Sequence, residues 1–453
     1  MIKCPNCTGE LEFDVSMQSV KCKYCGTVFN PNELNEQVKM SKEEENTFEG
    51  KSYKCSQCGA TLTTFDETAI TFCSYCGSQA MIESKLMKHD NPDFVIPFKK
   101  TKEECINAYK NKISKFIFLP KYMKQDVVCE KFRGIYMPYG IYEVGKNGKE
   151  VNHGSKYSHR SGDYVYYDEY SISSDIEAEY NGISYDLVSN FYDRFSNAIP
   201  YNYHEKVDFN PNYLTGYYAD SHDVDSDVYN DSAKSIAEYD CARKMGKMKE
   251  FSKYGCHSPK ASLDVKDKKI GLFPVYFLAI RNNDRLSYAV VNGQTGEVAV
   301  DLPVSFLKYV GISILISIIV FLLVNSFLVL TPNSVTIFSA LAGIVSLIVS
   351  AVQSKKINTR EKHEDDKGMM YSLKEKKTKE KKKMFKYLYK EILAIVIPIL
   401  VFFSNVVSDE YYYLASIVSF VLVILSFYDL VKEHNLLVSN RLPQLEKRGG
   451  DVN

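Results

Sequence analysis

The sequence predicts a multidomain fold: two small N-terminal β-modules, a strand-rich α+β domain over residues 94–302, and four transmembrane α-helices. Three observations predict it. One cysteine pattern occurs twice before residue 80. The middle of the chain alternates apolar and polar residues in short runs, as strands do. Four long apolar runs follow residue 305, and runs of that length are typical of membrane-spanning helices.

Composition limits the classes of protein to consider. The 453 residues carry 56 Lys and Arg against 56 Asp and Glu, so no overall charge attracts the chain to nucleic acid. The N-terminus has no basic start followed by an apolar run, so we expect no signal peptide and a cytosolic location for the first 300 residues. Twelve cysteines in a reducing compartment favour metal ligands over disulfides.

Eight of these cysteines form two sets with identical spacing, C-x2-C-x14-C-x2-C. Adding 51 to each member of the first set gives the second set, which indicates an internal duplication. Residues 1–30 are called ribbon 1 below, residues 53–85 ribbon 2, and residues 31–52 are predicted to be a polar linker between them. The candidate metal ligands are Cys4, Cys7, Cys22 and Cys25 in ribbon 1, and Cys55, Cys58, Cys73 and Cys76 in ribbon 2.

Two cysteines three apart form a knuckle that points both sulfurs at one place, and a hairpin brings a second knuckle to complete a tetrahedron. Gly26, Gly59 and Gly77 directly follow a knuckle, where positive φ is needed, whereas Thr8 departs from this pattern. We therefore predict two structural Zn²⁺ sites, each contributing on the order of 10 kcal/mol to the folding of a module too small to bury a core. The alternative is eight unliganded core cysteines.

Neither ribbon has the basic surface that phosphate recognition needs. Lysines and acidic residues balance in residues 1–30 and again in residues 51–85, so each ribbon has zero net charge. Between the ribbons, "NELNEQVKMSKEEENTFEG" is mostly acidic and is typical of a polar helix or linker. Nucleic acid is thus an improbable partner for these modules.

In the middle region, "TKEECINAYKNKIS" predicts a helix with Thr101 as N-cap and Glu104 completing a capping box. A second helix is predicted over about Ser232 to Tyr254, and a β-meander over residues 271–302. We interpret "GKNGKE" at residues 145–150 as a β-turn, and the acidic run at residues 220–231 as a solvated loop.

The middle region offers no catalytic motif. Residues 145–150 lack the Ser or Thr of a phosphate loop, and neither a nucleophile elbow nor a zinc-protease helix occurs. The four remaining cysteines lack metal spacing, and we expect ordinary buried thiols at Cys105, Cys129, Cys241 and Cys256. We therefore expect no enzyme activity and no catalytic residue.

The apolar runs cover residues 309–330, 335–352, 392–407 and 411–428, and form two transmembrane pairs, 309–352 and 392–430. For the two weaker runs, a buried soluble helical pair is the alternative. The loop at 353–391 is basic, with 14 Lys or Arg against seven Asp or Glu, and the tail at 431–453 carries Lys432, Arg441, Lys447 and Arg448. Basic segments stay in the cytoplasm, so we expect a multi-pass protein of the cell membrane with both termini inside.

The order of parts resembles the bacterial TFIIB-type zinc-ribbon membrane proteins, found mostly in Gram-positive bacteria, whose ribbons are often labelled as primosomal-helicase-like. The resemblance is carried by the eight cysteines and by "FPVYFLAIRNNDRLSYAVVNGQTGEVAVDLP" before the first apolar run. Some members are similar to membrane proteins that associate with phage-shock and flotillin-like envelope-stress proteins. The resemblance therefore implies a role at the membrane in envelope stress.

Three hypotheses of function follow. The leading one is a non-enzymatic membrane protein whose cytosolic zinc-ribbon head recruits a protein partner, with membrane lipid contacting the basic loop. The second is a membrane-tethered nucleic-acid-binding protein, which the lysine-rich loop supports. The third is a transport or channel subunit; the four apolar runs contain no charged residue, which disfavours it, and a polar path through the helices would support it.

Overall fold

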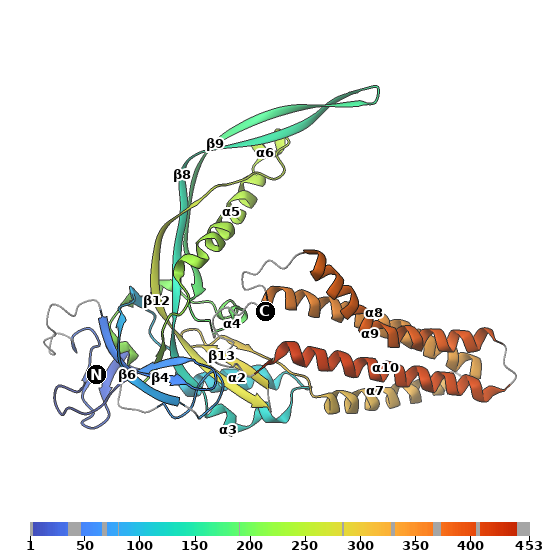
Figure 1. Cartoon of the computed structure of the whole chain (residues 1–453), viewed down its shortest axis with the longest axis horizontal. Coiled ribbons are helices and arrows are strands. Elements are labelled where there is room, and N and C mark those ends of the chain that lie inside the picture. The colour runs from blue at the N-terminus through green and yellow to red at the C-terminus, as the bar shows by residue number, and fades with distance from the viewer. Residues whose placement is uncertain are drawn as a thin grey trace.

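The structure is a computed structural model that describes residues 3–34, 47–65, 70–79, 81–189, 191–282, 285–327, 331–365, 373–404 and 408–441. It has a head built around a large sheet, a long two-stranded arm, and a bundle of helices that extends from the head (Figure 1). Most of the predicted linker (35–46), part of the basic loop (366–372) and the end of the tail (442–453) lie outside the described residues.

Ribbon 1 is a separate small sheet. Its strands are antiparallel and follow one another in the order β1-β2-β3, with Leu11 opposite Cys22 and Val20 opposite Phe29. The alternation in "LEFD" buries Leu11 and Phe13 on the face that packs against the head. Its strands are β1 (Leu11–Asp14), β2 (Ser19–Cys22) and β3 (Val28–Phe29).

Ribbon 2 is part of the main sheet. Its strands β4 (Thr47–Cys55), β5 (Thr61–Thr64) and β6 (Met81–Asp90) continue a twelve-stranded sheet through β11 (Tyr218–Asp220). The end of the predicted linker, residues 47–52, is already part of strand β4, because residues 47–51 pair with β6. The path through the sheet is β10 (Val207–Asp208), β7 (Phe94–Val95), β12 (Asp264–Asn282), β8 (Arg133–Ser161), then β11, β5, β4 and β6.

The predicted meander forms the centre of that sheet. Strands β12 (Asp264–Asn282), β13 (Arg285–Asn292) and β14 (Val298–Val300) pair antiparallel in sequence order. Two short strands extend the sheet beyond β12: β7 (Phe94–Val95) pairs with β12, and β10 (Val207–Asp208) pairs with β7 at the edge. Helix α2 (Lys102–Ser114) covers one face, and its predicted capping box between Thr101 and Glu104 is confirmed. Shorter helical turns complete the head: η2 (Lys121–Lys124), α3 (Asp126–Cys129), α4 (Asp193–Ser196), η3 (Tyr203–Glu205), η4 (Pro211–Leu214) and η5 (Ser226–Tyr229).

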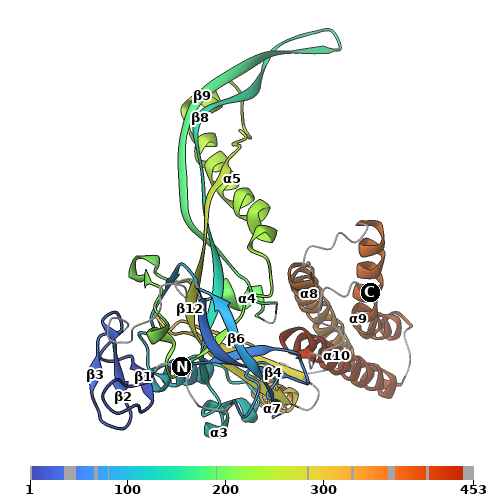
Figure 2. The ribbon, with the colours of Figure 1, turned by 60° about the vertical axis from the view of Figure 1, so that its left-hand side comes forward.

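The arm is the antiparallel pair of β8 (Arg133–Ser161) and β9 (Tyr164–Asp186), which projects from the head in Figures 1 and 2. The β-turn predicted at residues 145–150 is wrong, because this segment runs straight through β8 and pairs with residues 174–179 of β9. Gly145 has a packing reason instead: a Cβ there would lie 2.6 Å from the Ala178 carbonyl oxygen. The actual turn is at Gly162, where φ is +63°.

The predicted second helix is two helices, α5 (Asn230–Gly246) and α6 (Lys249–Lys253). Helix α5 lies along the lower part of the arm, and α6 follows it further out (Figure 1). Small residues of α5, among them Ala233 and Ala237, are buried against Tyr142 and Val144 of β8. This packing gives the lower arm a core of its own, distinct from the two clusters of the head.

The bundle contains α7 (Phe306–Phe327), α8 (Pro332–Asp365), α9 (Leu373–Phe403) and α10 (Asp409–Val438). A final strand, β15 (Asn440–Arg441), returns to pair with β13 of the head. The Asn435 side chain clamps this junction, accepting from the Val304 backbone NH at 2.7 Å and donating to its carbonyl at 2.8 Å. Described parts of the basic loop extend α8 and α9 as helix.

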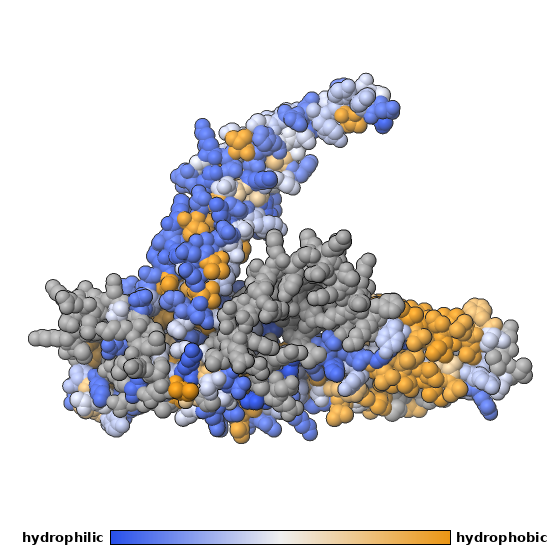
Figure 3. Space-filling view, in the orientation of Figure 1, coloured by the Kyte–Doolittle hydropathy of each residue, from blue (hydrophilic) through white to orange (hydrophobic). Residues whose placement is uncertain are grey.

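Among the described residues, two helical segments are long and apolar enough to cross a membrane: Pro332–Lys356 in α8 and Asp409–Asn435 in α10. In the most apolar stretch of each segment, only 33% (α8) and 22% (α10) is buried. These helices therefore turn most of their apolar side chains outward. Figure 3 shows the resulting apolar surface over the bundle. The other two predicted runs lie in α7, whose described apolar segment is Phe306–Leu315, and in α9.

Candidate metal centres

The four cysteine knuckles share one backbone geometry. In each, the first cysteine NH donates to the carbonyl five residues on, and the NH four residues on donates back to that cysteine, as for Cys55 with Ala60 and Gly59. The residue four on has positive φ in every described case: Gly26 (+71°), Gly59 (+71°), Gly77 (+68°) and Thr8 (+58°). The glycine prediction is confirmed, and Thr8 adopts the same backbone at the cost that a β-branched residue carries there.

The knuckles bring each predicted set of cysteines together. Within each set, the four Sγ atoms all lie within 4.8 Å of one another. Sγ–Sγ distances are 3.7 Å for Cys4–Cys25 and 3.4 Å for Cys7–Cys22 in ribbon 1. In ribbon 2 they are 3.6 Å for both Cys55–Cys76 and Cys58–Cys73. A tetrahedron with Zn–S bonds of about 2.3 Å has edges of about 3.8 Å, so both sets fit zinc.

The electrostatics of the thiols also favour a cation. In ribbon 2, the side-chain hydrogen bond with Cys58, followed by those with Cys73 and Cys76, lowers the pKa of Cys55. The bond with Cys55 raises the pKa of Cys73. Four cysteine thiols this close together cannot all lose their protons unless a positive charge compensates them. Zn²⁺ supplies that charge, and four sulfur ligands leave no open position for catalysis, so a bound zinc would hold the fold.

The two sites differ most in their surroundings, although their cysteines have identical spacing. All four cysteines of ribbon 2 are buried, whereas Cys7 and Cys25 of ribbon 1 are exposed. The equivalent tyrosines of the second knuckles, 51 residues apart, show the same contrast. Tyr75 is 1% exposed and its ring lies 5.1 Å from that of Phe277, whereas Tyr24 is 75% exposed. Site 2 is part of the core, and site 1 presents its knuckle at the surface.

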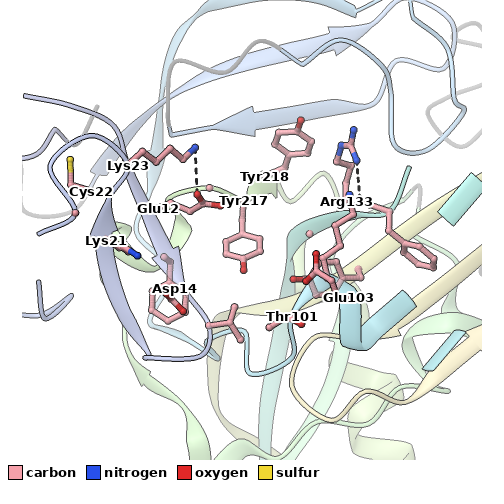
Figure 4. A pocket seen from close by; sticks show the side chains of 18 of the residues that line it. Glu12, Asp14, Lys21, Cys22, Lys23, Thr101, Glu103, Arg133, Tyr217 and Tyr218 are labelled. Carbon is pink, nitrogen blue, oxygen red and sulfur yellow. Dashed lines mark hydrogen bonds and ion pairs between the residues drawn. The ribbon is translucent and has the colours of Figure 1, made fainter. Parts of the chain in front are cut away.

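A cleft of about 1050 Å³ lies between ribbon 1 and the head (Figure 4). Its walls come from the hairpin β1–β2, the start of α2, the start of β8 and residues 216–218. The knuckle residues 22–26, Tyr24 included, form one edge. The aromatic floor is made by Tyr217, which stacks on Phe98 with ring centroids 4.1 Å apart, and by Tyr276. We call this the ribbon cleft.

Charges of both signs line the ribbon cleft: Lys21, Lys23, Lys102 and Arg133 with Glu12, Asp14 and Glu103. Lys23 is held between two carboxylates, 3.7 Å from Glu10 and 3.6 Å from Glu12. Lys102 and Arg133 both donate to the Glu130 carbonyl, at 3.0 and 2.9 Å. Burial and then the neighbouring Arg133 lower the pKa of Lys102. The cleft therefore has no single sign of charge.

Sequence reasoning placed all eight ligands but did not find the ribbon cleft, because its walls come from four separate segments. The cysteines outside the repeats, Cys105, Cys129, Cys241 and Cys256, are each buried and scattered over α2, α3, α5 and the loop after α6. Within the described part of the chain, the residues that could hold a metal are the two cysteine sets.

Comparison with known proteins gives one informative relative. The chain is 28% identical over 318 residues to the uncharacterized protein YdjG of Bacillus subtilis (strain 168), a match covering 67% of this chain and 90% of the relative. No family model matches the chain. No solved structure matches it.

Proposed function

We propose that this chain is a non-enzymatic, membrane-anchored zinc-ribbon protein that recruits a protein partner to the inner face of the cytoplasmic membrane. Ribbon 1 and the ribbon cleft form the docking surface, ribbon 2 and the sheet carry it, and the bundle is the anchor. The single observation that carries the proposal is the contrast between Tyr75, buried in the core, and Tyr24, exposed at the edge of the cleft.

The outward-facing apolar side chains of the bundle support a membrane anchor. Large apolar side chains on the outside of α8, α9 and α10 are exposed, such as Ile348 (59%), Leu400 (64%) and Ile417 (60%). A soluble bundle would bury them, whereas hydrocarbon solvates them. We propose that the anchor contains four spans in two pairs, with the short turns after α7 and α9 outside and the lysine-rich segment against anionic lipid inside.

The docking partner is a protein, because the charges suit one. A nucleic acid presents a continuous row of negative charge and needs a matching basic surface. The ribbon cleft alternates lysines with carboxylates, and Lys23 is already ion-paired with Glu10 and Glu12. A polypeptide segment with side chains of both signs and an aromatic or apolar anchor complements such a surface. The resemblance to zinc-ribbon membrane proteins supports a partner among the membrane proteins of envelope stress.

Affinity purification from detergent extracts tests the proposal. Wild type, Tyr24→Ala and Tyr239→Ala are compared, Tyr239 being an equally exposed tyrosine (73%) on α5 that serves as the control. A partner retained by wild type and by Tyr239→Ala, and lost with Tyr24→Ala, supports docking at ribbon 1. Partner recovery that is the same for all three proteins counts against it. A filter-binding assay over a salt series tests the alternative, since phosphate contacts give a steep salt slope.

A further inference from the structure

Polar side chains line the inside of the bundle, in a pattern the apolar composition of its helices conceals. On α8, small residues spaced three or four apart fall on one stripe: Thr336, Ser339, Gly343, Ser346, Ser350 and Ser354. The five hydroxyl residues among them are 1–3% exposed. This spacing is that of the seam between packed helices, so α8 turns its small polar face inward.

The facing helices present matching residues. Ser416, Ser419 and Ser426 of α10 are 1–3% exposed, and Ala394 of α9 is fully buried. The Ser419 hydroxyl crosses between helices and donates to the Ala394 carbonyl at 2.6 Å. On α8, a Cβ at Gly343 would lie 2.9 Å from the Ile395 side chain and 3.4 Å from the Ala394 backbone, so α8 and α9 are in close contact there.

A carboxylate lies at one end of this interior. Glu391 of α9 is 0% exposed, and its Oε1 accepts a hydrogen bond from Ser426 of α10. Its Oε2 is buried without a hydrogen-bond partner among the described residues, as are the hydroxyls of Ser346 and Ser350. Other buried hydroxyls of the seam are satisfied by their own helix, such as Ser339 on Thr336 at 2.8 Å. Three unsatisfied oxygens therefore belong to this end of the bundle.

Two of these oxygens, on Ser346 and Glu391, are at one level. Helices α8 and α9 run antiparallel, with Gly343 beside Ala394 and Ile395. Three residues along α8 lead to Ser346, and three residues back along α9 lead to Glu391, each a displacement of about 4.5 Å in the same direction. Ser350 lies one further turn along α8. The hydroxyls of α8 and the carboxylate of α9 thus share one segment of the interior.

One lysine serves two carboxylates near this segment. Lys390, the residue before Glu391, pairs with Asp429 of α10 and also interacts electrostatically with Glu391. Its single positive charge cannot balance both carboxylates, so these three residues keep one net negative charge. An ionised carboxylate in an apolar interior costs several kcal/mol unless a positive charge accompanies it.

We propose that one monovalent cation, a proton or a sodium ion, binds between Glu391 Oε2 and the serine hydroxyls of α8. One positive charge makes the segment neutral, whereas a divalent ion would leave an excess charge. The carboxylate and hydroxyl oxygens suit either source. Such a site gives the anchor a cation-dependent stability that does not depend on what the head recruits.

Thermal unfolding of the full chain in detergent tests this site. The Tm is followed across pH, with sodium exchanged for choline at constant ionic strength, for wild type, Glu391→Gln, Ser346→Ala and Glu410→Gln. Glu410, exposed at the other end of the bundle, is the matched control. A cation bound only by the folded state raises the Tm as its concentration rises.

In wild type and Glu410→Gln, we expect the Tm to rise by a few degrees on acidification or on sodium addition, and we expect Glu391→Gln to lose that part of the rise. A rise with acid alone identifies a proton, and a rise with sodium at fixed pH identifies sodium. If Glu391→Gln does not fold, a weakened response in Ser346→Ala supports the site. Identical responses in Ser346→Ala and wild type, or in Glu391→Gln and wild type, overturn it.

Discussion

The Tyr75 hydroxyl donates a hydrogen bond to the Asp220 carboxylate, joining the second knuckle of ribbon 2 to strand β11 of the main sheet. Burial first, and then the negative charge of Asp220, raises the pKa of Tyr75 well above its usual range, so the phenol remains a donor at neutral pH. The equivalent tyrosine of ribbon 1, Tyr24, is 75% exposed. One copy of a duplicated module has become core, and the other has kept a free surface.

This contrast predicts that the same substitution destabilises the protein at Tyr75 but not at Tyr24. Tyr75→Phe removes a buried donor to a carboxylate and should lower the free energy of unfolding by about 1–3 kcal/mol. Tyr24→Phe, the matched change in ribbon 1, should leave stability unchanged. Chemical denaturation of the full chain in detergent, followed by tyrosine fluorescence, measures both. Equal midpoints for Tyr75→Phe and wild type would refute the role given to the Asp220 contact.

Zinc analysis should find two ions per chain. Cys22→Ser should bind one, because it leaves ribbon 1 with three thiolates, and far-UV circular dichroism should show the helices retained. Cys105→Ser, a buried cysteine outside both sets, is the control and should keep two ions. A chelator should remove one zinc quickly, from the site with exposed Cys7 and Cys25, and the other slowly. One zinc per wild-type chain under metal-replete, reducing conditions would contradict the assignment.

The backbone of the knuckles predicts a pair of changes in zinc affinity. Thr8→Gly relieves a positive φ of +58° and should strengthen site 1 by about 1 kcal/mol, or roughly fivefold. Gly26→Ala should weaken it by a similar factor through backbone strain alone, since no atom lies within 4 Å of the added Cβ. Competition with a metallochromic chelator measures both, and shifts of the same sign would refute the argument.

The capping box of α2 predicts a pH dependence. The hydrogen bond from the Thr101 backbone NH, followed by that from Lys100, lowers the pKa of Glu104. A group whose pKa is lower in the folded state stabilises that state at pH values above its unfolded-state pKa. This contribution is lost as the pH falls through the folded-state pKa. At neutral pH, the Tm of wild type should therefore be higher than that of Glu104→Gln. This difference in Tm should disappear below about pH 4. Glu103→Gln, in the same turn, is the control; a pH-independent gap would contradict this.

The metal ligands could be read from the sequence because their chemistry fixes their spacing. The same holds for Thr101 and Glu104, whose capping role is local. Which of the two ribbons is buried could not be predicted from the sequence. The burial of Tyr75 depends on strand β11, which is about 145 residues away from Tyr75 along the chain. The turn predicted at residues 145–150 failed since cross-strand pairing with β9 outweighs local glycine preference. The regular spacing of small residues on α8, beginning at Thr336, is present in the sequence. Glu391, on the neighbouring helix α9, was instead assigned to the basic loop at 353–391.

Site-specific crosslinking in the native membrane tests the central claim most directly. A photoreactive phenylalanine analogue is placed at Tyr24 and, as control, at Tyr239. The account predicts a protein adduct from position 24, absent from position 239 and lost when Cys22→Ser is added. Adducts that form equally at both positions, that survive Cys22→Ser, or that consist of nucleic acid would contradict it.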